Sequence, residues 1–276
     1  MKAVFSLIII LIVLIAGCKN DSVSPVKFKR PRKSYDLAVE GCLNTLTTLQ
    51  FVKLSKPAML PDGQVTPVSG AKVSISDGNN QFLLSETNTP GLYSGNVSDN
   101  KNYRRFYSLK VQYNSKDYLA TDTLIALQPD DLPFTATQLT SGQVELTIPA
   151  HIFGAIRPVQ WLIAYNGIPN WSPSILNIQY PYTYSSELGA PNAVYPLTQD
   201  VRTADLNPTD TVTVYKFSQS QSYAAFLYNL FQETDFKGPF SSEPGNVYGN
   251  VSGNAEGYFH CTDVSVTKYL AKDLVK

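Results

Sequence analysis

Apolar and polar residues alternate with a period of two along several short stretches of this chain. The segment Ala71–Ser76 alternates in this way, and Arg105–Tyr113 carries aromatic or aliphatic residues at every second position. This period is typical of a β-strand with one buried face, because successive side chains point to opposite sides of a sheet. Turn-forming residues such as Asp77–Asn80 and Asn114–Asp117 separate these stretches. Short strands joined by tight turns predict a β-sandwich.

The alternating stretches fall into two series. The first begins at Tyr35, and its opening strand is expected to run from Leu37 towards Val52. Gln128–Pro133 is rich in Pro and Asp and has no apolar pattern, so we expect a domain boundary there. The pattern therefore predicts a mainly β fold of two β-sandwich domains, immunoglobulin-like or transthyretin-like, over residues 35–128 and 134–276. The second series consists of Gln143–Ile148, Trp161–Tyr165, Thr211–Phe217 and a final strand from Gly257 through Val266, with an irregular stretch at 166–210.

One segment of the second series follows a helical period instead. Its apolar residues recur at the spacing that forms one buried helix face, which predicts an amphipathic helix near 221–234 covering an edge or face of the second sheet. Ser220 or Ser222 can cap its start, and Lys237–Pro239 is expected to end it. The residues on the predicted face are Tyr223, Phe226, Leu227, Leu230 and Phe231.

The first eighteen residues have the pattern of a signal peptide. Lys2 precedes an apolar run that is too short to span a bilayer, and Ile15–Cys18 resembles the lipobox of bacterial lipoproteins. On this interpretation Cys18 becomes the first mature residue and carries a lipid that anchors the chain in a bilayer. The alternative is an ordinary secretory signal. Residues 19–34 have no apolar period, so they are expected to form a flexible tether.

The charge balance argues against a nucleic-acid partner. Lys and Arg number 22, as do Asp and Glu, so the formal net charge is zero and a basic face is not expected. The basic cluster at 27–33 lies in the expected tether, where it is either solvated or in contact with anionic headgroups.

The two remaining cysteines, Cys42 and Cys261, lie near opposite ends of the mature chain. An oxidising compartment would permit a disulfide between them, which would require the first and last strands to meet. Two buried, unpaired thiols are the alternative.

Catalytic patterns are absent from the sequence. The two histidines, His151 and His260, are not clustered with other ligands at the short spacings of an ordinary zinc site, and no Gly-x-Ser-x-Gly elbow or phosphate-binding glycine loop occurs. We therefore expect no enzyme activity, no cofactor and no metal. A hydrolase with a dispersed site stays a less favoured alternative, because triad members need not be close in sequence.

Aromatic residues give the strongest indication of binding. Trp171, Tyr180, Tyr182 and Tyr184 lie in the irregular stretch among Pro, Asn and Ser. Tyr and Trp offer a large contact area with a polar group, and long irregular loops are often functional. We expect an exposed binding surface here for an unidentified small ligand. The alternative is that these rings bury inward to stabilise the loop.

Several segments, in this order and spacing, resemble the domain-of-unknown-function 4249 family of Bacteroidetes-type lipoproteins. The resemblance covers the mature chain, and within it Pro67–Thr121 is similar to the transthyretin-like domain associated with carboxypeptidases. No catalytic residues are known for the family. The segments are Leu37–Gly41, Pro67–Asp77, Gly91–Tyr93, Tyr107–Val111, Tyr118–Thr121, Gly238–Phe240, Pro244–Val247 and Gly257–Phe259.

The resemblance implies an outer-membrane lipoprotein encoded beside a TonB-dependent receptor, and hence an accessory or binding role in nutrient uptake. Lys19–Asp21 resembles a signal for transfer to the outer leaflet, so we expect the cell surface rather than the periplasmic face. A surface adhesin or structural lipoprotein is the alternative.

Overall fold

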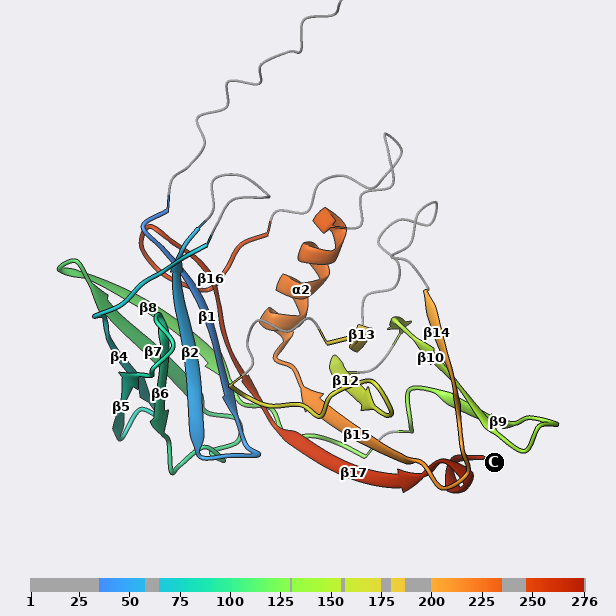
Figure 1. Cartoon of the computed structure of the whole chain (residues 1–276). Helices are drawn as coiled ribbons and strands as arrows, with labels where there is room; N and C mark the ends of the chain where they lie inside the picture. Colours follow the sequence, from blue (N-terminus) through green and yellow to red (C-terminus); the bar gives the residue numbers. More distant parts are fainter. Residues whose placement is uncertain are drawn as a thin grey trace, which may run out of the picture. The chain divides into compact units, whose positions relative to one another are not determined.

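The computed structural model describes residues 35–57, 65–129, 131–154, 157–174, 180–186, 200–234 and 247–275. These residues form three β-sheets and one α-helix (Figure 1). The expected mainly β fold, with sandwich-like packing and one amphipathic helix, is confirmed.

The largest sheet has nine strands in the order β16-β1-β2-β6-β5-β4-β7-β8, with β3 paired to β2. Its first segment differs from the expected single strand at 37–52, because a turn divides it. The Asn44 side chain accepts hydrogen bonds from the amides of Leu46 and Thr47, both at 3.0 Å, and so stabilises that turn. The strands are β1 (Leu37–Asn44), β2 (Leu49–Lys56), β3 (Thr66–Pro67), β4 (Lys72–Ser76), β5 (Gln81–Glu86), β6 (Leu92–Asn96), β7 (Phe106–Tyr113), β8 (Lys116–Thr123) and β16 (Ala255–Thr262).

The two edges of this sheet, β8 and β16, lie beside each other, so the sheet is nearly closed. The Asn250 side chain bridges them: its Nδ2 donates to the carbonyls of Thr121 (2.9 Å) and Phe259 (2.7 Å), and its Oδ1 accepts from the Phe259 amide. Asp122 of β8 also accepts a hydrogen bond from the Cys261 amide at 2.8 Å. Side chains thus satisfy edge groups that no ladder hydrogen bonds reach.

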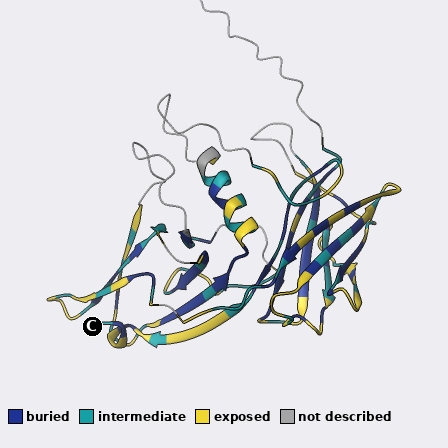
Figure 2. Ribbon diagram, turned by 180° about the vertical axis from the view of Figure 1, so that it is seen from behind, coloured by how far each residue is buried: buried dark blue, intermediate teal, exposed yellow. Residues whose placement is uncertain are grey.

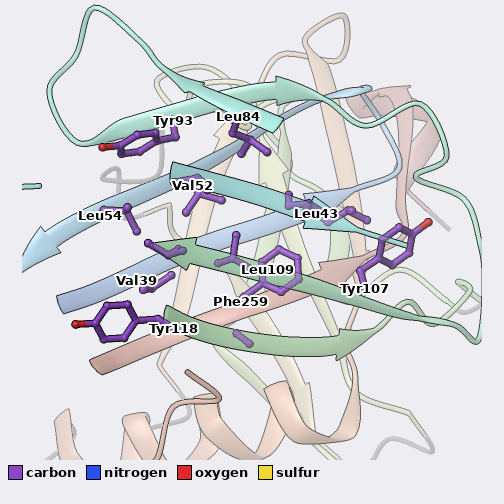
Figure 3. Close-up of a cluster of buried hydrophobic side chains, with 14 of the residues drawn as sticks. Val39, Leu43, Val52, Leu54, Leu84, Tyr93, Tyr107, Leu109, Tyr118 and Phe259 are labelled. Atoms are coloured by element: carbon purple, nitrogen blue, oxygen red, sulfur yellow. The ribbon is translucent and has the colours of Figure 1, made fainter. Parts of the chain in front are cut away.

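The nearly closed sheet surrounds a filled core. Residues from opposite sides of the sheet meet there, among them Val39 of β1, Leu109 of β7 and Phe259 of β16 (Figure 3). Val39 and Phe259 have no exposed surface, and Leu109 has 1%. Burial of such side chains stabilises a fold by about 1.5–3 kcal/mol each.

The other two sheets pack against each other around a second core. Val144 and Leu146 face Val159, Trp161 and Val212 across it. The three-stranded sheet has the order β14-β10-β9 and the five-stranded sheet the order β11-β13-β12-β15-β17. Their strands are β9 (Thr135–Gln138), β10 (Val144–Pro149), β11 (His151–Phe153), β12 (Val159–Ala164), β13 (Thr183–Ser186), β14 (Val201–Leu206), β15 (Thr211–Ser218) and β17 (Val264–Leu270), and a short 3-10 helix, η1 (Ala271–Leu274), follows β17.

The C-terminal strands differ from the prediction. The expected single strand from Gly257 through Val266 is divided at Asp263 into β16 and β17, which belong to different sheets. β16 pairs in parallel with β1, so it joins parts that the sequence assigns to separate domains. Tyr35–Lys276 form one compact unit, which begins where the sequence predicts the first β structure. β13 and β14 also lie in the stretch that was expected to be irregular.

The helix α2 (Gln221–Thr234) occupies the predicted range. Ser220 caps it, because its Oγ accepts a hydrogen bond from the Tyr223 amide at 3.1 Å. Its expected stop at 237–239 lies outside the described residues. Figure 2 shows buried residues on the strands beside α2, whereas β17 is largely exposed.

Candidate functional site

A cavity of about 380 Å³ lies where α2, β1, β16 and the five-stranded sheet meet. The loop at 171–173 completes its wall. The lining residues are Val39, Glu40, Gly41, Cys42, Gln160, Trp171, Ser172, Pro173, Tyr182, Tyr184, Phe217, Ser218, Tyr223, Phe226, Leu227, Leu230, Gly257, Tyr258, His260 and Thr262.

The β1–β16 pair forms one wall through its outer face. In the register of the parallel pair, Cys42 is opposite His260 and both side chains face the cavity. Gly257 permits this close approach: its φ is +104°, and a Cβ there would lie 2.0 Å from the Val39 carbonyl oxygen. A side chain at 257 would therefore push the two strands apart.

Helix α2 forms a second wall with its aromatic face. The rings of Tyr223 and His260 are stacked, with centroids 4.0 Å apart and an interplanar angle of 4°. Tyr258 contacts Tyr223 at 5.1 Å and Phe226 at 4.7 Å. The apolar face of α2, which the sequence predicts to be buried, thus packs against β16 at the edge of the nine-stranded sheet. It fills only part of the space between α2 and that strand.

Rings from the loop and the five-stranded sheet form a third wall. Trp171 meets Phe217 of β15 edge-on at 5.2 Å, and Tyr182 meets the same ring at 6.0 Å. Tyr184 of β13 lies 5.9 Å from Tyr182. Aromatic pairs in such tilted and edge-on arrangements gain about 0.5–1.5 kcal/mol beyond their burial, so they hold this wall in place.

The predicted aromatic surface is therefore brought together, but it does not face outward. Trp171, Tyr182 and Tyr184 are partly buried and line the cavity. Tyr180 is 7% exposed, packs against Tyr182 at 5.5 Å and lies behind the wall. For Tyr184 the physical reason is that the expected irregular stretch contains β13, which pairs with β12 and places this ring 4.6 Å from that of Phe231 on α2.

The groups around the cavity are held in their neutral forms. Burial lowers the pKa of His260 to about 4 and raises the pKa of Cys42 to about 12. Burial also raises the pKa of Tyr182 and of Tyr184. Among the described lining residues, only Glu40 is formally charged; it is exposed at the rim and forms an ion pair with Lys53 at 2.8 Å.

The structure shows the two cysteines of the predicted pair as free thiols. Cys42 and Cys261 lie on neighbouring strands, as a disulfide would require, but both are unpaired. The register places Cys42 beside His260 on the cavity side and Cys261 beside Leu43 in the core, so the two thiols point to opposite faces. A disulfide would require the register between β1 and β16 to shift by one residue.

Cys42 and His260 share a face, yet the pair lacks the electrostatics of a thiol nucleophile. A reactive cysteine has a lowered pKa, whereas desolvation, and then the charge of Asp122, raise that of Cys42. His151 lies apart on β11, against Tyr184 and Phe231. Within the described ranges, no group of three or more His, Cys, Asp or Glu could hold a metal ion.

Most polar side chains of the cavity bond within the protein. Gln160 accepts a hydrogen bond from Gln219 at 3.2 Å, and Thr262 donates to the Ser218 carbonyl at 2.9 Å. Tyr258 is 6% exposed, and its hydroxyl interacts with those of Ser220 and Ser222 at the start of α2. Burial raises the pKa of Tyr258 to about 12.

Sequence reasoning missed the β16 and α2 residues of the cavity as a binding site. The sequence places His260 and Tyr258 on a strand and Tyr223 on a helix, and what brings them together is the pairing of β1 with β16. Gly257 was the available signal, since a glycine inside a strand pattern often marks a close backbone approach.

The lipidation site Cys18 lies outside the described residues. Among the described helices, none has the length and apolar character needed to cross a bilayer.

A family model described as "Domain of unknown function (DUF4249)" matches residues 23–268. No curated protein matches the chain.

Proposed function

This chain belongs to the DUF4249 family, and we propose that it is a lipid-anchored accessory protein of the outer membrane that binds a small molecule in its aromatic cavity. In this role it works with a TonB-dependent transporter in nutrient uptake. The lipid on Cys18 holds it in the bilayer, with the folded part at the cell surface.

The hollow aromatic cavity is the observation that carries the binding role. Protein interiors are filled to the density of organic crystals, and voids larger than a water molecule are few. The side chains of the neighbouring core are buried, yet about 380 Å³ stays open between α2, the β1–β16 pair and the rings of the loop and the five-stranded sheet. Concave sites of this size with mainly apolar walls and a few polar groups are typical of ligand pockets.

The membrane and transporter parts of the proposal rest on the sequence. The apolar run before Ile15–Cys18 supports lipidation, and the family resemblance supports a TonB-dependent receptor as partner. A transporter that draws on a scarce nutrient gains from a neighbouring protein that holds the molecule near its entrance. The cavity supplies the holding step in this scheme.

Affinity purification from native membranes tests the partnership. The full chain carries a C-terminal tag, outer membranes are solubilised gently, and co-purifying proteins are identified by mass spectrometry. We expect a TonB-dependent transporter with the native chain and its loss with Cys18→Ser, which cannot be acylated. Recovery without any such transporter, or a native protein without acyl groups, contradicts the proposal. Protease treatment of intact cells tests the leaflet, because full protection excludes the cell surface.

A further inference from the structure

We infer that the cavity takes an uncharged aromatic molecule of one or two rings that carries few hydroxyl groups, and that it rejects both ions and sugars. The inference rests on the proposed binding role and defines the ligand class. It follows from the charge, the hydrogen bonding and the size of the cavity.

The charge of the lining excludes ions. Beyond the rim, where Glu40 is already paired with Lys53, the described part of the cavity wall offers no formal charge. His260 is neutral near pH 7, and burial keeps the Cys42 thiol protonated. A charged ligand would lose its hydration without gaining an opposite charge, which is far more costly than burial of a neutral molecule.

The hydrogen bonding of the lining excludes sugars. A sugar carries a hydroxyl on almost every carbon, and each hydroxyl that is buried without a partner costs about 1–3 kcal/mol. Here the Gln160 side-chain oxygen and the Ser218 hydroxyl oxygen already accept hydrogen bonds from within the protein, and the Thr262 hydroxyl donates one. The buried Tyr258 hydroxyl interacts with those of Ser220 and Ser222, which do not line the cavity, so it adds little polar capacity for a ligand.

The walls favour an aromatic ring. Trp171, Phe217, Tyr223, Phe226 and His260 line the cavity from the loop, the five-stranded sheet, α2 and β16, so an aromatic ligand meets aromatic rings on several sides. At about 30 Å³ for each water-sized group, the volume admits about a dozen non-hydrogen atoms. A naphthyl ring with a two-carbon alcohol is of this size.

Three probes that share a ring and differ in charge test the inference. Full-length lipidated protein in lipid nanodiscs is titrated calorimetrically with naphthylethanol, naphthylacetate and naphthylethylamine, with glucose as the sugar and with empty nanodiscs for subtraction. We expect naphthylethanol to bind at least about tenfold more tightly than either ion, and glucose to show no binding. Equal or tighter binding of an ion, binding of glucose, or no binding of naphthylethanol overturns the inference.

Two phenylalanine substitutions on one loop locate the binding site. Ser172 lines the cavity, whereas Ser174 is exposed and does not, although their hydroxyls lie 2.9 Å apart. Ser172→Phe should fill the cavity and abolish naphthylethanol binding, and Ser174→Phe should retain it. Equal affinity of the two variants overturns the assignment.

A second measurement does not depend on any variant. Cys42 lines the cavity, so bound naphthylethanol should slow its modification by methyl methanethiosulfonate in the unaltered protein. An unchanged rate at a saturating probe concentration overturns the inference. Failure in these assays leaves the transporter partnership standing, because purification of the complex does not use a ligand. Failure of the purification in turn leaves these results unaffected.

Discussion

The β1–β16 pair has two faces, and they differ in how completely they are filled. On the inner face Leu43, Phe259 and Cys261 have no exposed surface and belong to the core of the nearly closed sheet. On the outer face Cys42 and His260 border open space. Both faces follow from the same period of two. Periodicity therefore tells which residues share a face, whereas the composition of that face, aliphatic or aromatic and polar, indicates whether it is packed or hollow.

The largest expected effect is the loss of a ring from the filled face. Phe259→Ala leaves a void among side chains that cannot collapse, so it should lower the free energy of unfolding by about 3–5 kcal/mol. Phe226→Ala removes the same ring from the cavity wall, where open space already adjoins it, and should cost less than about half as much. Urea unfolding of both variants gives the comparison.

Equal losses for the two variants would contradict the difference between the faces. They would mean that the cavity closes around Phe226 in solution. Tightly packed sites and hollow sites give different truncation costs, because the cost grows with the volume left empty.

The next effect is a pH dependence that belongs to the hollow face. His260 has a pKa of about 4 in the fold against an ordinary value of 6.5, so between these values the unfolded chain binds more protons. Stability should therefore fall as the pH drops from about 6.5 to about 4, by no more than about 3 kcal/mol. The measurement is urea unfolding at several pH values, and His260→Gln should flatten the slope.

Asp122 provides the control with the opposite sign. Burial raises its pKa above 3.8, so the folded chain binds the extra proton and stability should rise as the pH falls through the range just above 3.8. Asp122→Asn removes that contribution and leaves the fall due to His260. A slope that persists in His260→Gln would assign the effect to another group.

The sequence predicted local structure well wherever one pattern was enough. Lys72–Ser76 and Gln81–Glu86 form strands where alternation and turn residues indicated them, and α2 occupies the expected range. It failed at strand ends such as Asn44 and Asp263, because the strand pattern continues on both sides of a break whose stabilising side-chain hydrogen bonds are visible only in the fold.

The sequence predicted one wall of the candidate site and missed the other, because that other wall depends on contacts between distant segments. The aromatic residues Trp171, Tyr182 and Tyr184 could be selected by type and context, but not the direction in which they face. The opposite wall depends on β1 meeting β16, a pairing between residues more than two hundred positions apart. Periodicity carries no information about such partners, so Cys42 and His260 could not be brought together from the sequence.

The two thiols report directly on the two faces. Cys42 borders the cavity, whereas Cys261 is fully buried in the core with its amide bonded to Asp122. We expect a small thiol reagent to modify Cys42 at least about tenfold faster than Cys261 in the native protein, since access to Cys261 requires unfolding. Peptide mass spectrometry measures both rates, with Cys42→Ser and Cys261→Ser to assign the signals. Faster labelling of Cys261, or a peptide linking the two residues, would contradict the register.

The smallest expected effect concerns the charge at the cavity rim. Glu40 bonds to Lys53 at 2.8 Å, but its side chain is 47% exposed, and surface ion pairs of this kind contribute about 0–1 kcal/mol. Glu40→Gln should therefore change the free energy of unfolding no more than Asp117→Asn, which breaks the comparable pair of Lys110 with Asp117 on the outside of the nine-stranded sheet. It should also leave naphthylethanol affinity unchanged. A large loss of affinity would show that the Glu40 charge takes part in ligand binding. The cavity would then select its ligand by charge as well as by its apolar walls.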